Sequence, residues 1–255
     1  MAVNLFCFDF DGTLVDKDHT PSFEPALAEQ LEAAGRGGAV WVINTGRSLH
    51  HTLEGVLGHR IPLAPDFIIA REHEIYARSA DGRWSDLGVW NGEARVIHDT
   101  FYRHHARVLG DIRRFVEGGQ LGWWIEEAGD PAGVITHTEE GMAQVIDFVH
   151  ERLAHWPDLG YQRNTIYLRF THRRFDKGTA LRELTRHLGL TAAEVFAAGD
   201  NFNDLPMLRR DLAHHLVAPE NSLPQVKSQV LDEGGRVSAL PASRAMAEAV
   251  ARLRG

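Results

Sequence analysis

Three short apolar runs alternate with helical patterns at the start of the chain, and this alternation constrains the fold most strongly. The runs are Val3–Phe8, Ala39–Ile43 and Phe67–Ala70, with helical periodicity over Glu24–Ala34 and Ser48–Leu57 between them. Short, continuous apolar runs are typical of parallel strands that are buried on both faces. The alternation therefore predicts right-handed β-α-β units and a mostly parallel sheet.

The pattern changes after the third run. Apolar periodicity over Glu93–Val116 predicts a long helix, which Gly110 could interrupt, and two strands, a second helix and two further strands follow. We expect an α/β fold in which a Rossmann-like parallel-sheet core, residues 1–80 and 171–255, is interrupted by an inserted α+β domain, residues 81–170.

The alternating pattern resumes in the last third of the chain. Gly178–Leu188 predicts a helix and Val195–Ala198 predicts a buried strand. We expect a short helix over Leu205–Arg209, a strand over Leu212–Val217 and a last helix over Ser243–Leu253. These elements would complete the parallel sheet of the core.

Composition and charge exclude several classes of protein. The 255 residues carry a formal net charge of -8 and no basic run, which argues against a nucleic-acid partner, because binding the phosphate backbone needs clustered Lys and Arg. The only cysteine, Cys7, allows no intrachain disulfide, and we expect a reducing, cytoplasmic location. No apolar run approaches the ~20 residues that span a membrane, and we expect neither a membrane partner nor a signal peptide.

Polar side chains follow three of the predicted strands at the point where each strand ends. These sets are Asp9 with Asp11, then Thr45, and finally Asp200 with Asn203 and Asp204. In an open parallel sheet, ligands bind at the carboxyl ends of the strands. We therefore expect these side chains to converge on one site although they are far apart in the sequence.

The chemistry of these residue types points to a phosphate site with a metal. Asp9 and Asp11 would repel each other unless a cation lies between them, although Asp-X-Asp-Gly is also ordinary turn chemistry. Asp200 adds a third carboxylate, and hard oxygen ligands of this kind suit Mg²⁺. Thr45 and Lys177 could hold phosphoryl oxygens, since Lys177 lies at the predicted start of a helix, where backbone N–H groups favour anions.

Four motifs in order carry a resemblance to a known family. They are Asp9-Phe-Asp-Gly-Thr13, Thr45-Gly-Arg47, Lys177-Gly178 and Gly199-Asp200-Asn-Phe-Asn203-Asp204. Together they resemble the haloacid dehalogenase superfamily of phosphohydrolases. The insert lies between the second and third motifs. It is similar to the larger α/β cap of the Cof-type sugar phosphatases, sucrose-phosphate phosphatases, mannosylglycerate-type phosphatases and phosphomannomutases.

The resemblance implies a role for each matching position. Asp9 would be the nucleophile that forms an aspartyl phosphate, and Asp11 the general acid and then the general base. The cofactor would be Mg²⁺, held by Asp9, the backbone carbonyl of Asp11 and Asp200. The phosphoryl group would be bound by Thr45, Gly46, Lys177 and Asn203. Asp204 would orient the metal ligands or Lys177, and Arg47 would have a supporting role.

One segment departs from the family's pattern. Related Cof-type chains often carry an Asn-Gly pair after the third strand, where this chain has Ala70-Arg71-Glu72-His73-Glu74. This difference affects the expected substrate contacts and leaves the phosphate chemistry intact.

The motifs favour a phosphatase whose partner is a small phosphate ester, with a sugar or polyol phosphate as the expected substrate. Two alternatives remain open. A sugar phosphomutase would use the same core, although the insert has no basic cluster that would hold a second phosphate. A phosphoacceptor protein in signalling would use a similar acidic pair, Thr and Lys. Asp11 argues against it, because a second acid speeds the loss of the phosphoryl group.

Overall fold

The protein is described from a computed structural model over residues 2–127 and 129–254, and its chain divides into two compact units. The core unit contains the residues up to Asn91 and those from Asp176 onward, and the insert unit is Gly92–Phe175. The insert expected from the sequence, residues 81–170, begins earlier than this unit. The reason is that Trp84–Asp86 pairs with Glu74–Arg78 in the sheet of the core.

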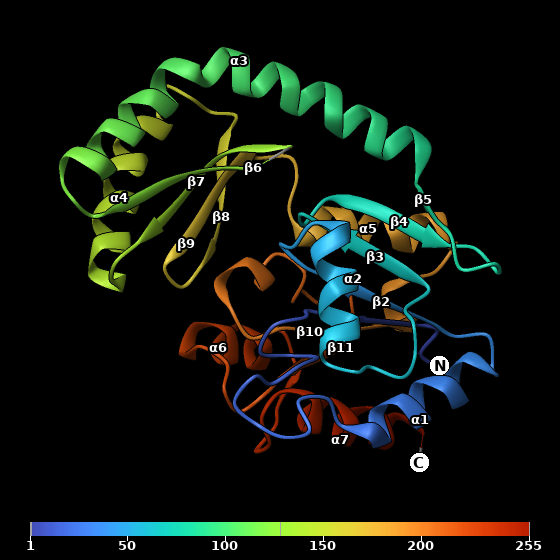
Figure 1. Ribbon diagram of the computed structural model, residues 1–255. Helices are drawn as coiled ribbons and strands as arrows, with labels where there is room; N and C mark the ends of the chain where they lie inside the picture. Colours follow the sequence, from blue (N-terminus) through green and yellow to red (C-terminus); the bar gives the residue numbers. More distant parts are fainter. Residues whose placement is uncertain (1, 128, 255) are drawn as a thin grey trace. The chain divides into compact units, whose positions relative to one another are not determined.

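The core unit is built on an eight-stranded sheet (Figure 1). In chain order its strands are β1 (Leu5–Phe8), β2 (Val40–Asn44), β3 (Phe67–Ala70), β4 (Glu74–Arg78), β5 (Trp84–Asp86), β10 (Val195–Ala198), β11 (His215–Ala218) and β12 (Arg236–Val237). The spatial order is β12-β11-β10-β1-β2-β3-β4-β5. The first six strands in this order are mutually parallel, β4 runs antiparallel to β3, and β5 runs antiparallel to β4. The predicted α/β class with a mainly parallel sheet is confirmed.

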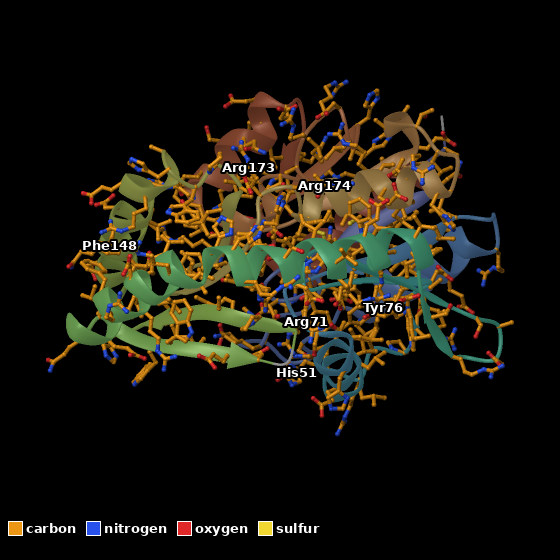
Figure 2. The ribbon with its side chains drawn as sticks, turned by 90° about the horizontal axis from the view of Figure 1, so that it is seen from above. His51, Arg71, Tyr76, Phe148, Arg173 and Arg174 are labelled. Atoms are coloured by element: carbon orange, nitrogen blue, oxygen red, sulfur yellow. The ribbon has the colours of Figure 1, made fainter. Side chains whose placement is uncertain are left out.

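The insert unit has its own sheet and its own core. Its elements are α3 (Gly88–Gly118, which begins in the core unit), β6 (Gly122–Glu127), β7 (Asp130–Thr136), α4 (Glu139–Leu153), β8 (Leu159–Asn164) and β9 (Tyr167–His172). The four strands are antiparallel in the order β6-β7-β9-β8. Phe148 of α4, labelled in Figure 2, stacks on Phe115 of α3 with ring centroids 3.9 Å apart. Gly110 does not interrupt α3, because buried Leu109 and Ile112 tie this stretch to the core of the unit.

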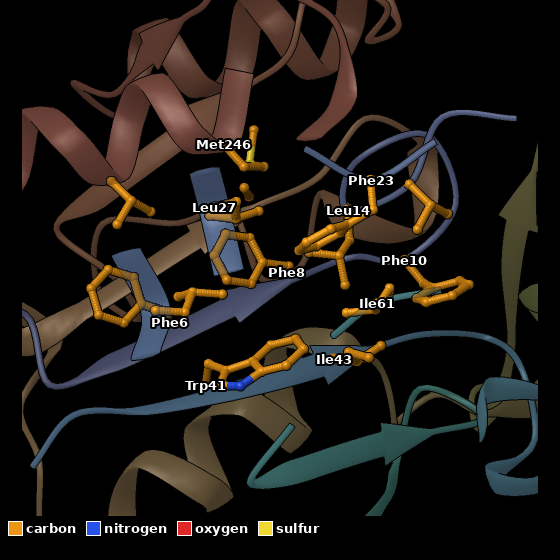
Figure 3. Close-up of a cluster of buried hydrophobic side chains, with 14 of the residues drawn as sticks. Phe6, Phe8, Phe10, Leu14, Phe23, Leu27, Trp41, Ile43, Ile61 and Met246 are labelled. Carbon is orange, nitrogen blue, oxygen red and sulfur yellow. The ribbon is translucent and has the colours of Figure 1, made fainter. Parts of the chain in front are cut away.

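Alternate residues of β1 face opposite sides of the core sheet, and each side is covered by helices. Phe6 and Phe8 pack with residues of α1 (Pro25–Gly35) and α7 (Ala242–Arg254), as Figure 3 shows for Leu27 and Met246. On the other side, Leu5 and Cys7 pack with residues of α5 (Lys177–His187) and α6 (Pro224–Asp232). Burial raises the pKa of the Cys7 thiol to about 12, so this cysteine is an inert core residue.

Two local predictions in the core unit were wrong. Leu205–Arg209 is not a helix: a single 3₁₀ turn, η2 (Phe202–Asp204), is followed by turns, since Pro206 has no N–H to donate. The strand expected from Leu212 begins only at His215, because the N–H groups of Leu212 and Ala213 both bond to the carbonyl of Arg209 in a turn.

The remaining elements of the core unit are α2 (Leu49–Gly58) and η1 (Ala192–Glu194). Ser48 caps α2 with its side chain, which accepts a hydrogen bond from the His51 N–H. Across both described stretches of the chain, no helix is long and apolar enough to cross a membrane.

Candidate active site

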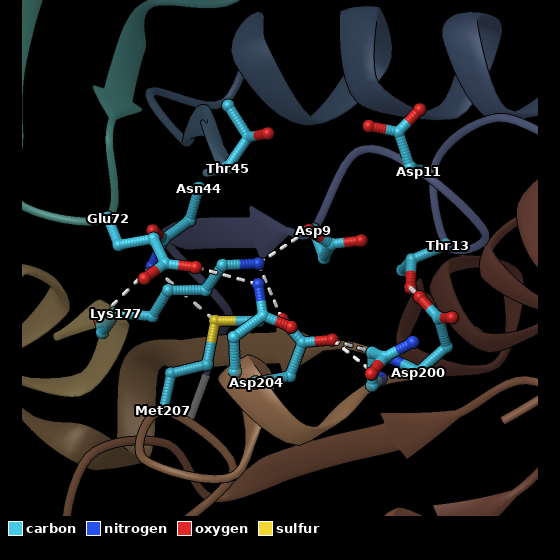
Figure 4. Close-up of polar contacts among 12 residues, drawn as sticks. Asp9, Asp11, Thr13, Asn44, Thr45, Glu72, Lys177, Asp200, Asp204 and Met207 are labelled. Carbon is cyan, nitrogen blue, oxygen red and sulfur yellow. Dashed lines mark hydrogen bonds and ion pairs between the residues drawn. The ribbon is translucent and has the colours of Figure 1, made fainter. Parts of the chain in front are cut away.

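The carboxyl ends of the central strands carry the candidate site, as the sheet topology predicts. Asp9 follows β1, Thr45 follows β2, Asp200 comes two residues after β10, and Lys177 is the first residue of α5. The structure brings Asp9, Lys177, Asp200 and Asp204 together in one buried cluster (Figure 4).

Lys177 lies at the centre of this buried cluster. Its ammonium is fully buried and donates to Asp9 Oδ1 at 2.5 Å and to Asp204 Oδ1 at 2.6 Å. Asp176 fixes its position through a capping box with Thr179 at the start of α5. Burial alone would lower the pKa of Lys177, but the carboxylates of Asp204, Asp9 and Glu72 outweigh it and the pKa is raised. Lys177 is therefore a permanent cation.

Asp204 uses both of its oxygens for contacts within the protein. Oδ1 accepts from Lys177, and Oδ2 accepts the backbone N–H groups of Asp200 at 2.8 Å and of Asn201 at 2.9 Å. The carboxylate thus ties the Gly199–Asn203 loop to Lys177. Among the acidic groups of the site, Asp9 and Asp200 are therefore better suited than Asp204 to bind a metal.

The carboxyl groups of Asp9, Asp200 and Asp204 lie close enough to share a cation, with one oxygen from each within 4.8 Å of the others. Burial, and then the charge of Asp204, raise the pKa of Asp9 well above its usual range and that of Asp200 to about 7. A divalent cation between Asp9 and Asp200 would offset this repulsion and keep both groups ionised. Because all the donors are hard oxygens, the set fits Mg²⁺.

Two motif glycines allow the close approach of the loops around the cluster. Gly12 has φ +86°, and a Cβ added there would lie 2.6 Å from Asp200 Oδ2. A Cβ on Gly178 would lie 2.2 Å from the carbonyl oxygen of Pro206. The Asp-Phe-Asp-Gly-Thr and Lys-Gly motifs therefore carry glycine for packing reasons that are specific to this site.

Asp11 is set apart from the buried cluster. Its carboxylate accepts Arg47 Nε at 2.7 Å and Nη2 at 2.6 Å, and 47% of its side chain is exposed. Figure 4 shows the Asp11 carboxylate apart from Lys177. The Arg47 guanidinium also lies over the ring of Phe10, 5.0 Å from its centroid. The structure therefore pairs the expected acid with an arginine at the edge of the site.

The other predicted phosphate ligands lie on loops beside the cluster. Thr45 is buried and its hydroxyl accepts the Arg47 N–H at 3.2 Å, with Gly46 between them in the chain. Asn203 is buried and its Nδ2 donates to Glu72 Oε1 at 2.7 Å. Thr45, Gly46 and Asn203 are thus on the same edge of the sheet as Lys177.

Two residues of the site received no role from the sequence. Thr13 Oγ1 donates to Asp200 Oδ1 at 2.7 Å, and Glu72 binds Asn203. Thr13 belongs to the first motif. Glu72 follows the carboxyl end of β3, so the rule that ligands bind at the carboxyl ends of parallel strands applied to Glu72 as it did to Thr45. The sequence did not indicate a role for Glu72, because a glutamate in a surface turn is ordinarily solvated.

The class of protein follows from this fold, this site and the comparisons with known families. Residues 131–232 match the sequence model of a family described as haloacid dehalogenase-like hydrolases. Over this stretch the chain is similar to haloacid dehalogenase-like hydrolases, and the relatives and solved structures that match it over most of its length include phosphatases.

Particular relatives support this assignment. The HMP-PP phosphatases of Yersinia pseudotuberculosis and Yersinia pestis are 26% identical over 259 residues, which cover 89% of this chain and 87% of each relative. The sucrose-phosphatase of Synechocystis sp. PCC6803, solved with sucrose and phosphate, superposes with a TM-score of 0.75 at 19% identity and covers 100% of this chain and 99% of that one. A haloacid dehalogenase-like hydrolase from B. subtilis gives a TM-score of 0.65 at 18% identity, with coverage of 98% and 100%. At these identities the two structures establish a shared fold.

Proposed function

We propose that this phosphatase hydrolyses a small phosphate ester with Mg²⁺ and forms an aspartyl phosphate on Asp9. The observation that carries the proposal is the fully buried Lys177 ammonium held between Asp9 and Asp204, with Asp200 beside them. A carboxylate nucleophile needs fixed positive charge beside it, because it must approach a phosphate that is itself an anion. Lys177 supplies one such charge.

In the first half of the reaction, an oxygen of Asp9 attacks phosphorus and the bond from phosphorus to the ester oxygen breaks. The leaving oxygen takes a proton from Asp11. In the second half, Asp11 takes a proton from water, the water oxygen attacks phosphorus, and the bond to Asp9 breaks. Phosphate leaves and both aspartates return to their starting states.

Asp11 must turn away from Arg47 to take part in these steps. In the pair with Arg47, both oxygens of Asp11 accept hydrogen bonds from the guanidinium, so neither faces a leaving group. An exposed ion pair contributes only about 0–1 kcal/mol, so the pair with Arg47 does not lock the side chain in place. The 47% exposure of Asp11 supports a side chain with freedom to rotate.

The remaining residues bind and orient the phosphoryl group. We assign the Thr45 hydroxyl, the Gly46 N–H, Lys177 and Asn203 to its non-reacting oxygens, and Asp204 to the orientation of Lys177. Asp9, the Asp11 carbonyl and Asp200 would hold Mg²⁺, which when bound supplies positive charge against the phosphate. A loose transition state of phosphoryl transfer depends on such positioning and charge.

The first substrate class we propose is sugar or polyol phosphates. The Synechocystis neighbour was solved with sucrose and phosphate, and its fold matches across this whole chain. HMP-PP is the second candidate, because the Yersinia relatives that carry this name match 89% of the chain in sequence. Either substrate would bind with one phosphoryl group at the buried cluster around Lys177.

The test is release of inorganic phosphate from a panel of sugar phosphates, polyol phosphates and HMP-PP, with Mg²⁺ and with EDTA. We expect Mg²⁺-dependent turnover that Asp9→Asn lowers by at least about 10⁴-fold, because this substitution removes the nucleophile. A mutase would instead yield an isomeric sugar phosphate, and a signalling phosphoacceptor would keep its phosphoryl group after one turnover. Either result would contradict the proposal.

A further inference from the structure

The turn between β3 and β4 holds two neighbouring residues in a left-handed backbone conformation. Arg71 has φ 47° and Glu72 has φ 66°. The His73 N–H donates to the Ala70 carbonyl at 3.0 Å and closes a β-turn around these two residues. Turns with two left-handed central residues favour Asn-Gly, because larger side chains fit the left-handed region poorly. This chain therefore keeps a glutamate at a position where glycine would be less strained.

The backbone of this turn holds the loop that follows β2. The Arg71 N–H donates to the carbonyl of Arg47 at 2.8 Å, and the Glu72 N–H donates to the carbonyl of Thr45 at 2.9 Å. Thr45 is one of the residues proposed to bind phosphate. The left-handed turn is thus tied to the phosphate-binding loop by two hydrogen bonds.

The side chain of Glu72 points inward, toward residues that are proposed to bind phosphate. Only 4% of Glu72 is exposed, and its Oε1 accepts Asn203 Nδ2 at 2.7 Å. Figure 4 shows Glu72 next to Lys177, and its charge is one of those that act on the Lys177 ammonium. A carboxylate near a phosphate site is unfavourable for anion binding, so another benefit must offset its presence.

The chemistry of the Asn203 amide suggests that benefit. A carboxylate only accepts hydrogen bonds, so Glu72 selects the orientation in which the NH₂ group of Asn203 faces it. The second hydrogen of the same nitrogen then remains available for a phosphate oxygen, which also only accepts. In the flipped orientation, Asn203 Oδ1 would face the carboxylate and repel it.

We propose that Glu72 is a positioning residue for phosphate binding, which orients the Asn203 amide through its side chain and the Thr45 loop through its backbone. This inference rests on the proposed phosphate-binding roles of Thr45 and Asn203. Glu72 acts through its neighbours and is given no contact with the substrate.

The test measures binding of inorganic phosphate with Mg²⁺ by calorimetry, together with KM, kcat and the melting temperature. Glu72→Gln keeps the acceptor and should bind phosphate within about twofold of the wild type. Glu72→Gly removes the acceptor and the strain, and should weaken phosphate binding and raise KM by about tenfold, with kcat nearly unchanged and no loss of melting temperature. Asn203→Ala should make Glu72→Gly no worse, because both substitutions remove the same contact.

Arg71→Gly is the matched control. It relieves the same kind of backbone strain in the same turn and leaves the Glu72–Asn203 bond in place, so phosphate binding should not change. If Glu72→Gly fails to fold, Glu72→Asn replaces it. Asparagine tolerates the left-handed region, and its side chain is too short to reach Asn203.

The outcomes separate this inference from the proposed function. If the Glu72→Gly or Glu72→Asn protein binds inorganic phosphate with the same affinity as the wild type, the positioning role alone is overturned. A loss in Glu72→Gln as large as in Glu72→Gly also overturns it, because charge would then matter more than orientation. A folded wild type that neither binds phosphate nor hydrolyses any ester overturns both.

Discussion

The two sides of the candidate site differ in how firmly their charges are held. On one side, Asp9, Lys177 and Asp204 are buried and joined by bonds of 2.5 and 2.6 Å. On the other, Asp11 and Arg47 form an ion pair with 47% and 35% of their side chains exposed. The buried side suits fixed charge stabilisation and the exposed side suits a proton carrier that must move. We propose that the site separates these two tasks in space.

Among substitutions that distinguish the two sides of the site, replacement of Asp11, the proposed proton carrier, should have the largest effect on turnover. We expect Asp11→Asn to lower kcat by about 10²–10⁴-fold, the range that is typical of positioned proton transfer. Phosphate binding and melting temperature should stay close to the wild type, since the buried side is untouched. Asp18→Asn, an exposed carboxylate of the same segment, serves as the control for loss of charge. A marked fall in the melting temperature of Asp11→Asn would contradict the view that the exposed side of the site contributes little to stability.

Removal of the buried cation should instead affect stability. Lys177→Met leaves Asp9 and Asp204 as buried carboxylates without their partner, which should lower the free energy of unfolding by about 3–5 kcal/mol. Urea denaturation in EDTA measures this change. The control is Arg182→Met, which removes an exposed ion pair with Asp211 and should cost less than about 1 kcal/mol. A Lys177→Met protein as stable as this control would show that the buried cluster is not tightly coupled.

The pH dependence of stability should reveal the buried carboxylates. The folded pKa of Asp200 is raised to about 7, mainly by burial and then by Asp204, above the usual 3.8. The folded state therefore holds the proton more tightly, and this contribution to stability is full below about pH 4 and is lost as the pH rises through 7. In EDTA, the wild type should lose stability relative to Asp200→Asn across that window. Parallel pH profiles for the two proteins would contradict the assignment.

The smallest effect is expected for the exposed partner of Asp11. Arg47→Ala should change the free energy of unfolding by less than about 1 kcal/mol, because an exposed ion pair is weak. It should change kcat by no more than about threefold, since Asp11 remains able to reach the leaving group. Steady-state kinetics and urea denaturation check both values. A loss of kcat as large as that in Asp11→Asn would assign Arg47 a direct role in the chemistry.

The sequence predicted the parts of this molecule that depend on period and topology. Buried strands such as Leu5–Phe8 read as continuous apolar runs, and the end of each parallel strand located Asp9, Thr45 and Asp200 on one edge. Lys177 was predicted at a helix start and begins α5. Side-chain pairing was beyond these rules, because neither the Asp11–Arg47 pair nor the Glu72–Asn203 bond follows from periodicity. The turns after Asp204 were missed because the apolar pattern of Leu205–Arg209 was given more weight than Pro206, which has no N–H to donate.

The proposed mechanism requires that Asp9 carries the phosphoryl group during turnover. The most direct measurement is rapid acid quench of the enzyme during hydrolysis of its best substrate with Mg²⁺, followed by mass spectrometry of the peptide that contains Asp9. We predict one added phosphoryl group on Asp9, more of it in Asp11→Asn, where the second half of the reaction is slowed, and none in Asp9→Asn. Turnover without any phosphoryl group on Asp9, or with the group on another residue, would contradict a role for Asp9 as the nucleophile.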